Sequence, residues 1–390
     1  VAGAALTGLS GWPGQEAGAA VVALLTGSDT KTRIAAIGAV RQRRITAAVP
    51  ALLKAAGDAD AGVAGASFKA LGELGGVAEL PGMVDAMCQT KAVPAAESAL
   101  SAICARQPDP TICADPLLPG LAKAQGEPKL ALLRVLGTVG GPKALAAVRA
   151  AAADSDPSVK ETALRALCDW PTADALADLA QIAKANGDTK FKLLALRGQI
   201  RLIPMQTVAD TQKLSQLKPI LPLLERKEEQ SLALAALGGL PSVESLALIR
   251  PYLTVEGLKE EASVAAVTVA EKIAASHPAE VAEAMKQVQT NNKELAERVR
   301  KVLARVPKNA TEAGFTPIFN GKDLSGWYGK PGWWTVEDGA LTAESTPDKP
   351  CKECNYLIWR AGQPADFELL ADFRLSGAGN SGIQLRSQAL

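Results

Sequence analysis

The sequence predicts a multidomain chain, α then β, with a long helical solenoid, a short linker and an antiparallel β-sandwich. Two observations carry this prediction. A helix-pair unit recurs roughly every 30 to 34 residues, which is the period of a helical solenoid. After residue 306 the composition changes, and ten of the fifteen aromatic residues lie between Phe315 and Phe373. The predicted divisions are 1–306 for the solenoid, 307–314 for the linker and 315–390 for the β-domain.

The repeat is marked by an aliphatic residue followed by Gly or Cys. The clear marks are Ile37-Gly38, Leu71-Gly72, Ile103-Cys104, Leu136-Gly137, Leu167-Cys168 and Leu237-Gly238, with a weaker copy at Arg197-Gly198 and degenerate copies near Val269 and Val302. Small aliphatic residues dominate these units, and such residues let helices pack closely at little side-chain entropy cost.

Turn residues bound the helices of each unit. Asp154, Ser155 and Asp156 before Pro157 supply an N-cap and a proline for the first helical turn. Gly140-Gly141-Pro142 ends one helix and opens the next. The sequence therefore predicts helix pairs joined by short turns.

The first residues of the chain align in register with a later unit. Trp12-Pro13 falls on Trp170-Pro171, so we expect the chain to begin inside a repeat. The units resemble the short HEAT-like repeats of the phycobilisome-lyase type over about three-quarters of the chain. Such arrays expose a long face, which favours docking of a protein partner, and a rigid spacer for the C-terminal domain is the alternative.

Composition excludes several classes of function. Lys and Arg total 42 against 41 Asp and Glu, so no nucleic-acid partner is expected, and the basic cluster Arg41 to Arg44 is a solvated helix end. No apolar run reaches the roughly eighteen residues of a membrane span. The sequence has one histidine, His277, which is expected in a turn as a cap or surface residue. Because it is the single histidine of the sequence, His-based triads and multi-His zinc sites are excluded within it.

Short alternating runs predict the strands of the β-domain. Residues 333–344 predict a hairpin that turns at Asp338-Gly339, and residues 355–360 and 381–387 predict further strands. The run 367–375 predicts an amphipathic strand whose apolar face holds Phe367, Leu369, Ala371, Phe373 and Leu375.

Four blocks of this region carry a family resemblance. In chain order they are residues 315–327 ("FTPIFNGKDLSGW"), 333–341 ("WWTVEDGAL"), 366–375 ("DFELLADFRL") and 379–387 ("GNSGIQLRS"). They resemble the 3-keto-disaccharide hydrolase domain family, which implies a concanavalin-like, laminin-G-like jelly roll. The resemblance also implies cleavage of glycosidic bonds in sugars oxidised at the 3-position.

The family resemblance also bears on the extent and origin of the chain. Domains of this family are about twice as long as 315–390, so we expect an incomplete domain that is inactive by itself. The pairing with HEAT-like repeats resembles multidomain bacterial proteins of the planctomycete kind, which implies export to the periplasm or the extracellular space.

Polar residues of the matching blocks form the candidate site. Glu368 is the candidate catalytic base, or a ligand of a divalent metal in the complete domain. Arg386 is the second catalytic candidate and, with Asn380, would bind substrate oxygens or a developing enolate. The other candidates for substrate binding are Arg374, Gln384 and Trp334.

These candidates have structural alternatives. Glu368 and Arg374 would form an ion pair on a solvated sheet face, and residues 380–382 would build a tight turn. The tryptophans would either stack on sugar rings or fill the sandwich core: Trp327, Trp333 and Trp334.

The six cysteines suggest two bridges. Cys104 and Cys113 bracket a loop that a disulfide would close. Cys351 and Cys354 form a C-x-x-C pair, for which a disulfide or redox-labile pair is favoured over half of a zinc site. The remaining two are expected in the helical core: Cys88 and Cys168.

Three functions are consistent with these patterns. The first is an exported hydrolase that acts on the glycosidic bonds of 3-keto-disaccharides, with the solenoid as a scaffold. The second is a non-catalytic carbohydrate- or surface-binding protein, and the third is a scaffold in which the β-domain caps the array. No cofactor is expected apart from the divalent metal named above.

Overall fold

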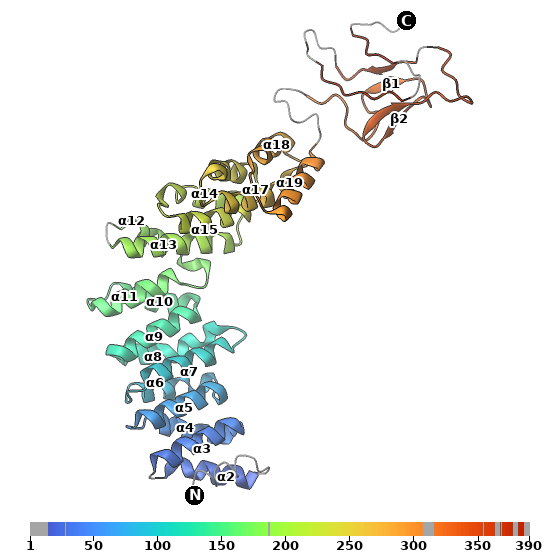
Figure 1. Ribbon diagram of the computed structural model, residues 1–390. Helices are drawn as coiled ribbons and strands as arrows, with labels where there is room; N and C mark the ends of the chain where they lie inside the picture. The colour runs from blue at the N-terminus through green and yellow to red at the C-terminus, as the bar shows by residue number, and fades with distance from the viewer. Residues whose placement is uncertain are drawn as a thin grey trace.

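The computed structural model describes residues 15–27, 29–185, 188–306, 316–353, 355–362, 367, 369–376 and 381–385. Helices form an elongated stack up to residue 305, and short antiparallel strands follow it (Figure 1). The predicted fold class, helical repeats and then antiparallel β-structure, is confirmed. Within the described residues, no helix has the length and apolar character that a membrane crossing requires.

The helices alternate between two layers. The odd-numbered helices are α3 (Thr30–Gln42), α5 (Ala61–Leu74), α7 (Val93–Ala105), α9 (Gly126–Val139), α11 (Pro157–Cys168), α13 (Thr189–Leu202), α15 (Lys227–Gly238), α17 (Lys259–Ile273) and α19 (Lys293–Arg305). The even-numbered helices are α2 (Gln15–Ala23), α4 (Val49–Ala56), α6 (Leu80–Met87), α8 (Ala114–Lys123), α10 (Gly141–Ala152), α12 (Leu176–Lys184), α14 (Asp210–Leu217), α16 (Val243–Ile249) and α18 (Pro278–Gln287).

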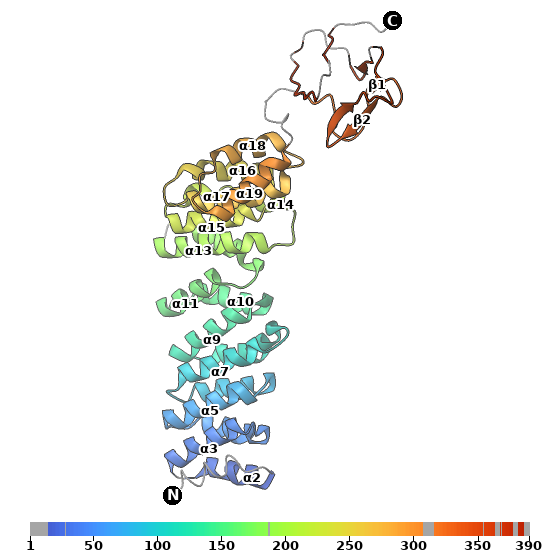
Figure 2. The same cartoon turned by 45° about the vertical axis from the view of Figure 1, so that its right-hand side comes forward.

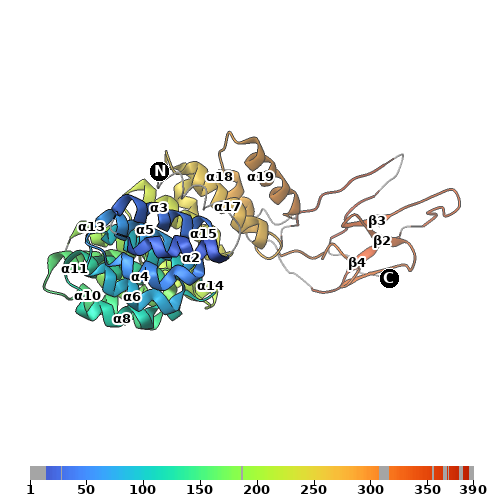
Figure 3. The ribbon, with the colours of Figure 1, turned by 90° about the horizontal axis from the view of Figure 1, so that it is seen from below.

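Short 3-10 turns join many of these helices. They are η1 (Leu24–Thr26), η2 (Thr46–Ala48), η3 (Val77–Glu79), η4 (Pro110–Cys113), η5 (Ala173–Ala175), η6 (Ile203–Met205), η7 (Leu221–Leu223) and η8 (Arg250–Thr254). Figure 2 shows the stack from a second side, and Figure 3 shows helices α4, α6, α8 and α10 along one side of it.

A continuous apolar core runs between the two layers. One large cluster extends from Val21 to Ala175 and a second from Leu196 to Val306. A small cluster lies between them and consists of Cys168, Leu179, Ala195 and Leu202. Each unit therefore buries its apolar surface against its neighbours, as expected of a solenoid.

Three glycines of the repeat marks lie where neighbouring odd-numbered helices meet. An ideal Cβ at Gly72 would lie 3.1 Å from Ala99 Cα, and one at Gly137 would lie 2.9 Å from Ala166 Cβ. Gly238 has the same relation to Ala265, at 3.1 Å from its Cα. These three register marks thus lie at close contacts between α5 and α7, α9 and α11, and α15 and α17.

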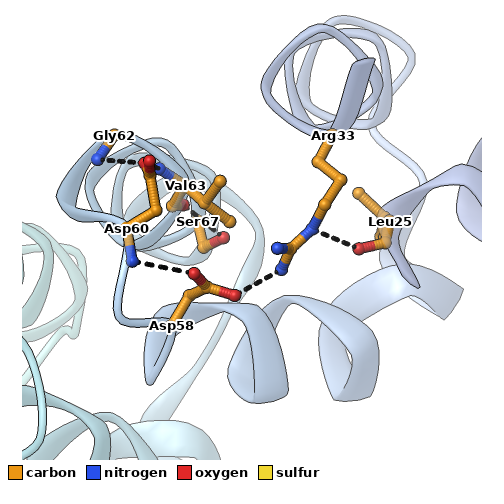
Figure 4. Close-up of polar contacts among 7 residues, drawn as sticks. All are labelled: Leu25, Arg33, Asp58, Asp60, Gly62, Val63 and Ser67. Carbon is orange, nitrogen blue, oxygen red and sulfur yellow. Dashed lines mark hydrogen bonds and ion pairs between the residues drawn. The ribbon is translucent and has the colours of Figure 1, made fainter. Parts of the chain in front are cut away.

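Acidic residues in the turns link each unit to the one before it. Asp60 caps α5 by accepting from the backbone N–H of Gly62 at 2.9 Å. Asp58 accepts from the backbone N–H of Asp60 at 2.9 Å and from Arg33 Nη2 at 2.7 Å, while Arg33 Nε donates to the Leu25 carbonyl at 3.0 Å (Figure 4). The Asp60 N–H and then Arg33 lower the pKa of Asp58.

The same arrangement recurs 96 residues later. Asp154 accepts from the backbone N–H of Asp156 at 3.0 Å and from Lys129 Nζ at 2.9 Å. Asp156 caps α11 by accepting from the N–H of Ser158 at 2.8 Å, and Pro157 opens the helix, as predicted. In each pair the first aspartate holds the preceding unit and the second begins the next helix.

Arginines also bind the ends of preceding helices. The Arg106 guanidinium donates to the carbonyls of Gly72 and Gly75, the latter at 2.7 Å. Arg201 Nη2 donates to the Trp170 carbonyl at 2.8 Å. Both arginines thereby satisfy carbonyls that have no partner within their own helix.

In the described part of the C-terminal region, four short strands form two antiparallel pairs. β1 (Trp327–Gly329) pairs with β4 (Leu357–Trp359), and β2 (Trp334–Glu337) pairs with β3 (Ala340–Ala343). Asp338 and Gly339 have φ of 49° and 75°, as the predicted two-residue hairpin turn requires.

The strand predicted for 367–375 is wrong for the described residues of that segment, which have no strand conformation. The described part of the strand predicted for 381–387 also lacks it. Alternation gives an extended segment two faces, but a strand also needs a hydrogen-bonded neighbour. Four apolar side chains of these two segments nevertheless line one shallow hollow: Phe367, Leu369, Ile383 and Leu385.

We expect Gly137→Ala to destabilise the solenoid by about 1–3 kcal/mol, because the new Cβ would overlap Ala166. Gly38→Ala is the matched control, since Gly38 lies in α3 with no atom within 4 Å of an added Cβ. That control should stabilise the protein by about 0.5–1 kcal/mol. Urea unfolding measures both changes, and equal effects of the two substitutions would contradict the close-packing explanation.

A second prediction concerns the buried carboxylate of Glu229, which has no exposed surface. Arg197 Nε donates to its Oε1 at 2.7 Å, and its Oε2 has no partner among the described residues. Arg197→Met should cost about 3–5 kcal/mol because it leaves a buried charge unpaired. Lys218→Met, which breaks an exposed pair with Glu244, should cost about 0–1 kcal/mol.

Chemical denaturation compares the two variants, and Arg197→Met/Glu229→Leu should recover most of the lost stability. Similar losses for Arg197→Met and Lys218→Met would show that burial of Glu229 does not decide the effect.

Candidate functional site

The β1–β4 sheet has two chemically different faces. Antiparallel pairing sets Trp327 opposite Trp359 and Tyr328 opposite Ile358. Because side chains alternate along a strand, the tryptophans lie on one face and Tyr328 and Ile358 on the other. Strand alternation thus places the two tryptophans and Tyr328 on opposite faces of this sheet.

The tryptophan face is directed toward the rest of the β-region. Trp327 is half-buried, and its Nε1 donates to the Ile318 carbonyl at 3.0 Å. The Trp359 ring lies so close to Gly362 that an added Cβ would be 2.7 Å from its Cη2. These two tryptophans therefore act as packing residues.

The opposite face exposes two tyrosines. Tyr328 is 59% exposed and Tyr356 is 48% exposed. The Arg360 guanidinium lies 4.4 Å from the centre of the Tyr328 ring, a cation–π distance. We call Tyr328, Tyr356, Ile358 and Arg360 the tyrosine face. Flat aromatic rings beside hydrogen-bonding groups can hold a ring-shaped polar ligand.

Gln384 joins the tyrosine face from a distant part of the chain. Its Nε2 donates to the Tyr356 hydroxyl at 3.3 Å. Its neighbours Ile383 and Leu385 line the apolar hollow instead. The predicted alternation of Gln384 with those two residues is therefore present, and it brings one predicted site residue to the tyrosines.

Two further tryptophans lie at the hairpin. Trp334, a predicted substrate-binding residue, is half-buried on β2, and its Nε1 is buried without a partner among the described residues. Its ring packs close to Gly329 of β1. Lys349 Nζ lies 4.5 Å from the centre of the Trp333 ring.

A rigid turn precedes β1. Asn320 Oδ1 accepts from the N–H groups of Lys322 and Asp323, and Asp323 Oδ1 accepts from the Ser325 N–H at 2.9 Å. Hydrogen bonds from Ser325 and Asn320 lower the pKa of Asp323 to about 2. Asp323 is thus an ionised turn former over the physiological range and fixes the chain as it enters the sheet.

The structure places only part of the predicted site. Arg374 is exposed, while Glu368, Asn380 and Arg386 lie outside the described residues. Sequence reasoning missed Tyr328, Tyr356 and Arg360. The run 355–360 held the signal, because alternate residues from Tyr356 to Arg360 share one strand face.

Metal-ligating side chains do not cluster in the described part of the chain. No group of three or more His, Cys, Asp or Glu residues there could hold a metal ion. Glu368, the ligand named for the expected divalent metal, lies outside the described residues, so we derive no step through a metal. Cys351 is a free thiol whose Sγ accepts from Asn355 Nδ2 at 3.2 Å, and Cys354 lies outside the described residues.

Comparisons with protein families match two parts of the chain. Residues 18–104 and 114–197 match the family model of HEAT repeats. Residues 314–389 match the model of the 3-keto-alpha-glucoside-1,2-lyase-like domain. The chain is therefore similar to HEAT repeats in its N-terminal part and to the 3-keto-alpha-glucoside-1,2-lyase-like domain in its C-terminal part. No curated protein matches the chain.

Solved structures show similar helical chains at low identity. An engineered protein is 18% identical, with 80% of this chain and 95% of that chain covered and a TM-score of 0.42. The complex of CpcE and CpcF of phycocyanin lyase from Nostoc sp. PCC7120 is also 18% identical, with 74% and 93% covered and a TM-score of 0.29. A Kap121p mutant is 12% identical, with 76% and 42% covered and a TM-score of 0.43. These likenesses carry no argument about function.

Proposed function

We propose that the protein cleaves glycosidic bonds of 3-keto-disaccharides or related 3-keto-glycosides through its C-terminal domain. The helical repeats serve as a scaffold that binds a protein partner. The match of residues 314–389 to the 3-keto-alpha-glucoside-1,2-lyase-like domain is the observation that carries this proposal. The proposed location is the periplasm or the extracellular space.

The chemistry follows from the 3-keto group of the substrate. A carbonyl at C3 acidifies the hydrogen on C2, so a base can take that proton and leave an enolate. The enolate electrons then form the C1–C2 double bond as the C1–O bond breaks. The departing oxygen takes a proton from an acid, and water can later add to the double bond. Cleavage needs a base, an oxyanion partner and an acid.

Proposed roles follow the residue types in the family blocks. Glu368 is the proposed base, and Arg386 and Asn380 are the proposed partners of the enolate oxygen. Arg374 and Gln384 are proposed to bind substrate hydroxyl groups. The contact of Gln384 with the Tyr356 hydroxyl supports its role, because it places an amide beside an exposed aromatic ring.

Glu368→Gln in the full-length protein should lower kcat on 3-keto-trehalose by at least about 100-fold, because the amide cannot accept the C2 proton. KM should change little, since the side chain keeps its size. Glu344→Gln, an exposed carboxylate at the end of the hairpin, is the control and should retain activity. Release of glucose measures the rate, and full activity of Glu368→Gln would remove that residue from its proposed role.

The tyrosine face favours a second function, carbohydrate binding without catalysis. Its exposed rings, with Arg360 and Gln384 beside them, match the pattern of a sugar-binding surface. The lyase proposal requires turnover, whereas this alternative requires only saturable binding of an unmodified oligosaccharide.

We expect Tyr328→Ala to weaken binding of trehalose or 3-keto-trehalose by roughly 5- to 10-fold, through loss of a stacked ring. Tyr328→Phe is the matched control and should bind like the unmodified protein, because it keeps the ring. Isothermal titration calorimetry measures both affinities. Equal affinities for all three proteins would exclude the tyrosine face as the sugar-binding surface.

A further inference from the structure

Cys104 and Cys113 lie at the two ends of the connection between α7 and α8. Cys104 is the second-last residue of α7, and Cys113 is the last residue of η4. Both are free cysteines, with 2% and 0% of their surfaces exposed. Both side chains belong to the same apolar core cluster, and the two thiols interact with each other. Two cysteine side chains are therefore held near each other inside the solenoid.

The connection between the two cysteines is held at several points. Arg106 donates to the Gly75 carbonyl of the preceding unit at 2.7 Å, and Gln107 Nε2 donates to the Ile103 carbonyl at 2.9 Å. Asp109 Oδ1 accepts from the N–H and the hydroxyl of Thr111, at 3.0 and 2.7 Å. The position of each thiol is thus set by a fixed backbone.

The other described cysteines have different surroundings. Cys88 was expected in the core, but the residue is exposed. The limited burial of its thiol, followed by the charge of Asp85, raises the pKa of Cys88. Cys168 is buried as expected, and burial followed by Asp169 raises its pKa to about 12.

We propose that Cys104 and Cys113 form an intramolecular disulfide that staples the α7–α8 connection. The oxidant is a disulfide, either a small molecule such as oxidised glutathione or a protein disulfide. One cysteine thiolate attacks it and gives a mixed disulfide, and the second cysteine displaces the bound thiol. The two cysteines lose two protons and two electrons, and the oxidant is released as two thiols.

Burial determines when this reaction takes place. Burial and the contact with Cys113 raise the pKa of Cys104, so in the folded protein its thiol stays protonated and is a poor nucleophile. While the chain is unfolded, both thiols are accessible to the oxidant, and Cys104 lacks the burial that raises its pKa. The bridge therefore forms during folding, and the folded structure then protects it from reducing thiols.

The disulfide would act on the stability of one repeat. It closes a ten-residue loop, from Cys104 to Cys113. Closure of a loop of that size restricts the open state and suppresses local opening by roughly 10- to 100-fold. The affected unit lies inside the large N-terminal core cluster, where each repeat depends on its neighbours.

Refolding with glutathione tests the bridge. The full chain is reduced, unfolded in urea and refolded with a mixture of oxidised and reduced glutathione, and free thiols are then blocked with a maleimide. Peptide mass mapping should show Cys104 linked to Cys113, and Cys168→Ser, the matched buried control, should give the same link. Maleimide on both Cys104 and Cys113, or a link from either to another cysteine, would overturn the proposal.

Hydrogen exchange tests the stapling effect in the unmodified sequence. Amides at the end of α7 and in η4 should exchange roughly 10- to 100-fold more slowly in the oxidised than in the reduced protein. The comparison needs no cysteine substitution, so it does not depend on whether a variant folds. Cys113→Ser should show no difference between the two conditions. Equal exchange in the oxidised and reduced unmodified proteins would show that the bridge does not staple this repeat.

Discussion

Gly72, Gly137 and Gly238 lie at close contacts between neighbouring odd-numbered helices, where an added Cβ atom would stand 2.9 to 3.1 Å from an alanine of the next helix, and such contacts constrain how these repeats stack. Interiors are packed as densely as organic crystals, so a contact this close fixes the separation and register of two helices. The glycines carry a cost in helix propensity of about 1 kcal/mol each. That cost is offset because each close approach lets the larger side chains around it enter a common core.

Polar links then determine which ends of the helices meet. Asp58 and Asp154 connect a cation of the preceding unit to the cap of the next helix. Arg106 and Arg201 satisfy carbonyls at the end of an earlier helix. These contacts join residues 25 to 34 positions apart, so each connects one unit with a neighbouring unit. Packing supplies most of the stability, and these links select one register.

In the C-terminal region, the aromatic residues divide into packed tryptophans and exposed tyrosines. Strand alternation places Trp327 and Trp359 on one face of the β1–β4 sheet and Tyr328 on the other. The tryptophans pack, while Tyr328 and Tyr356 remain exposed beside Arg360 and Gln384. A ligand surface in this region therefore depends on a pairing of strands that are 28 residues apart.

Local patterns were sufficient for much of the fold. The helix pairs, the cap at Asp156, the break at Gly140-Gly141 and the hairpin at Asp338-Gly339 all rest on interactions between residues close in sequence, and all were predicted. The prediction for segment 367–375 was wrong for its described residues. Alternation along the sequence is a local property, whereas a strand also requires a hydrogen-bonded partner from elsewhere in the chain.

The candidate site shows the same limit. The sequence identified Gln384 and Trp334 as polar or aromatic candidates from their blocks, but it could not say which aromatic rings would be exposed. The register that sets Tyr328 opposite Ile358 decided that, and a contact between segments 28 residues apart brought Gln384 to Tyr356. By itself the sequence determined the class of architecture and the family blocks, since composition and periodicity are local properties. Only the tertiary structure decided which side chains meet, because those contacts join residues far apart in the chain.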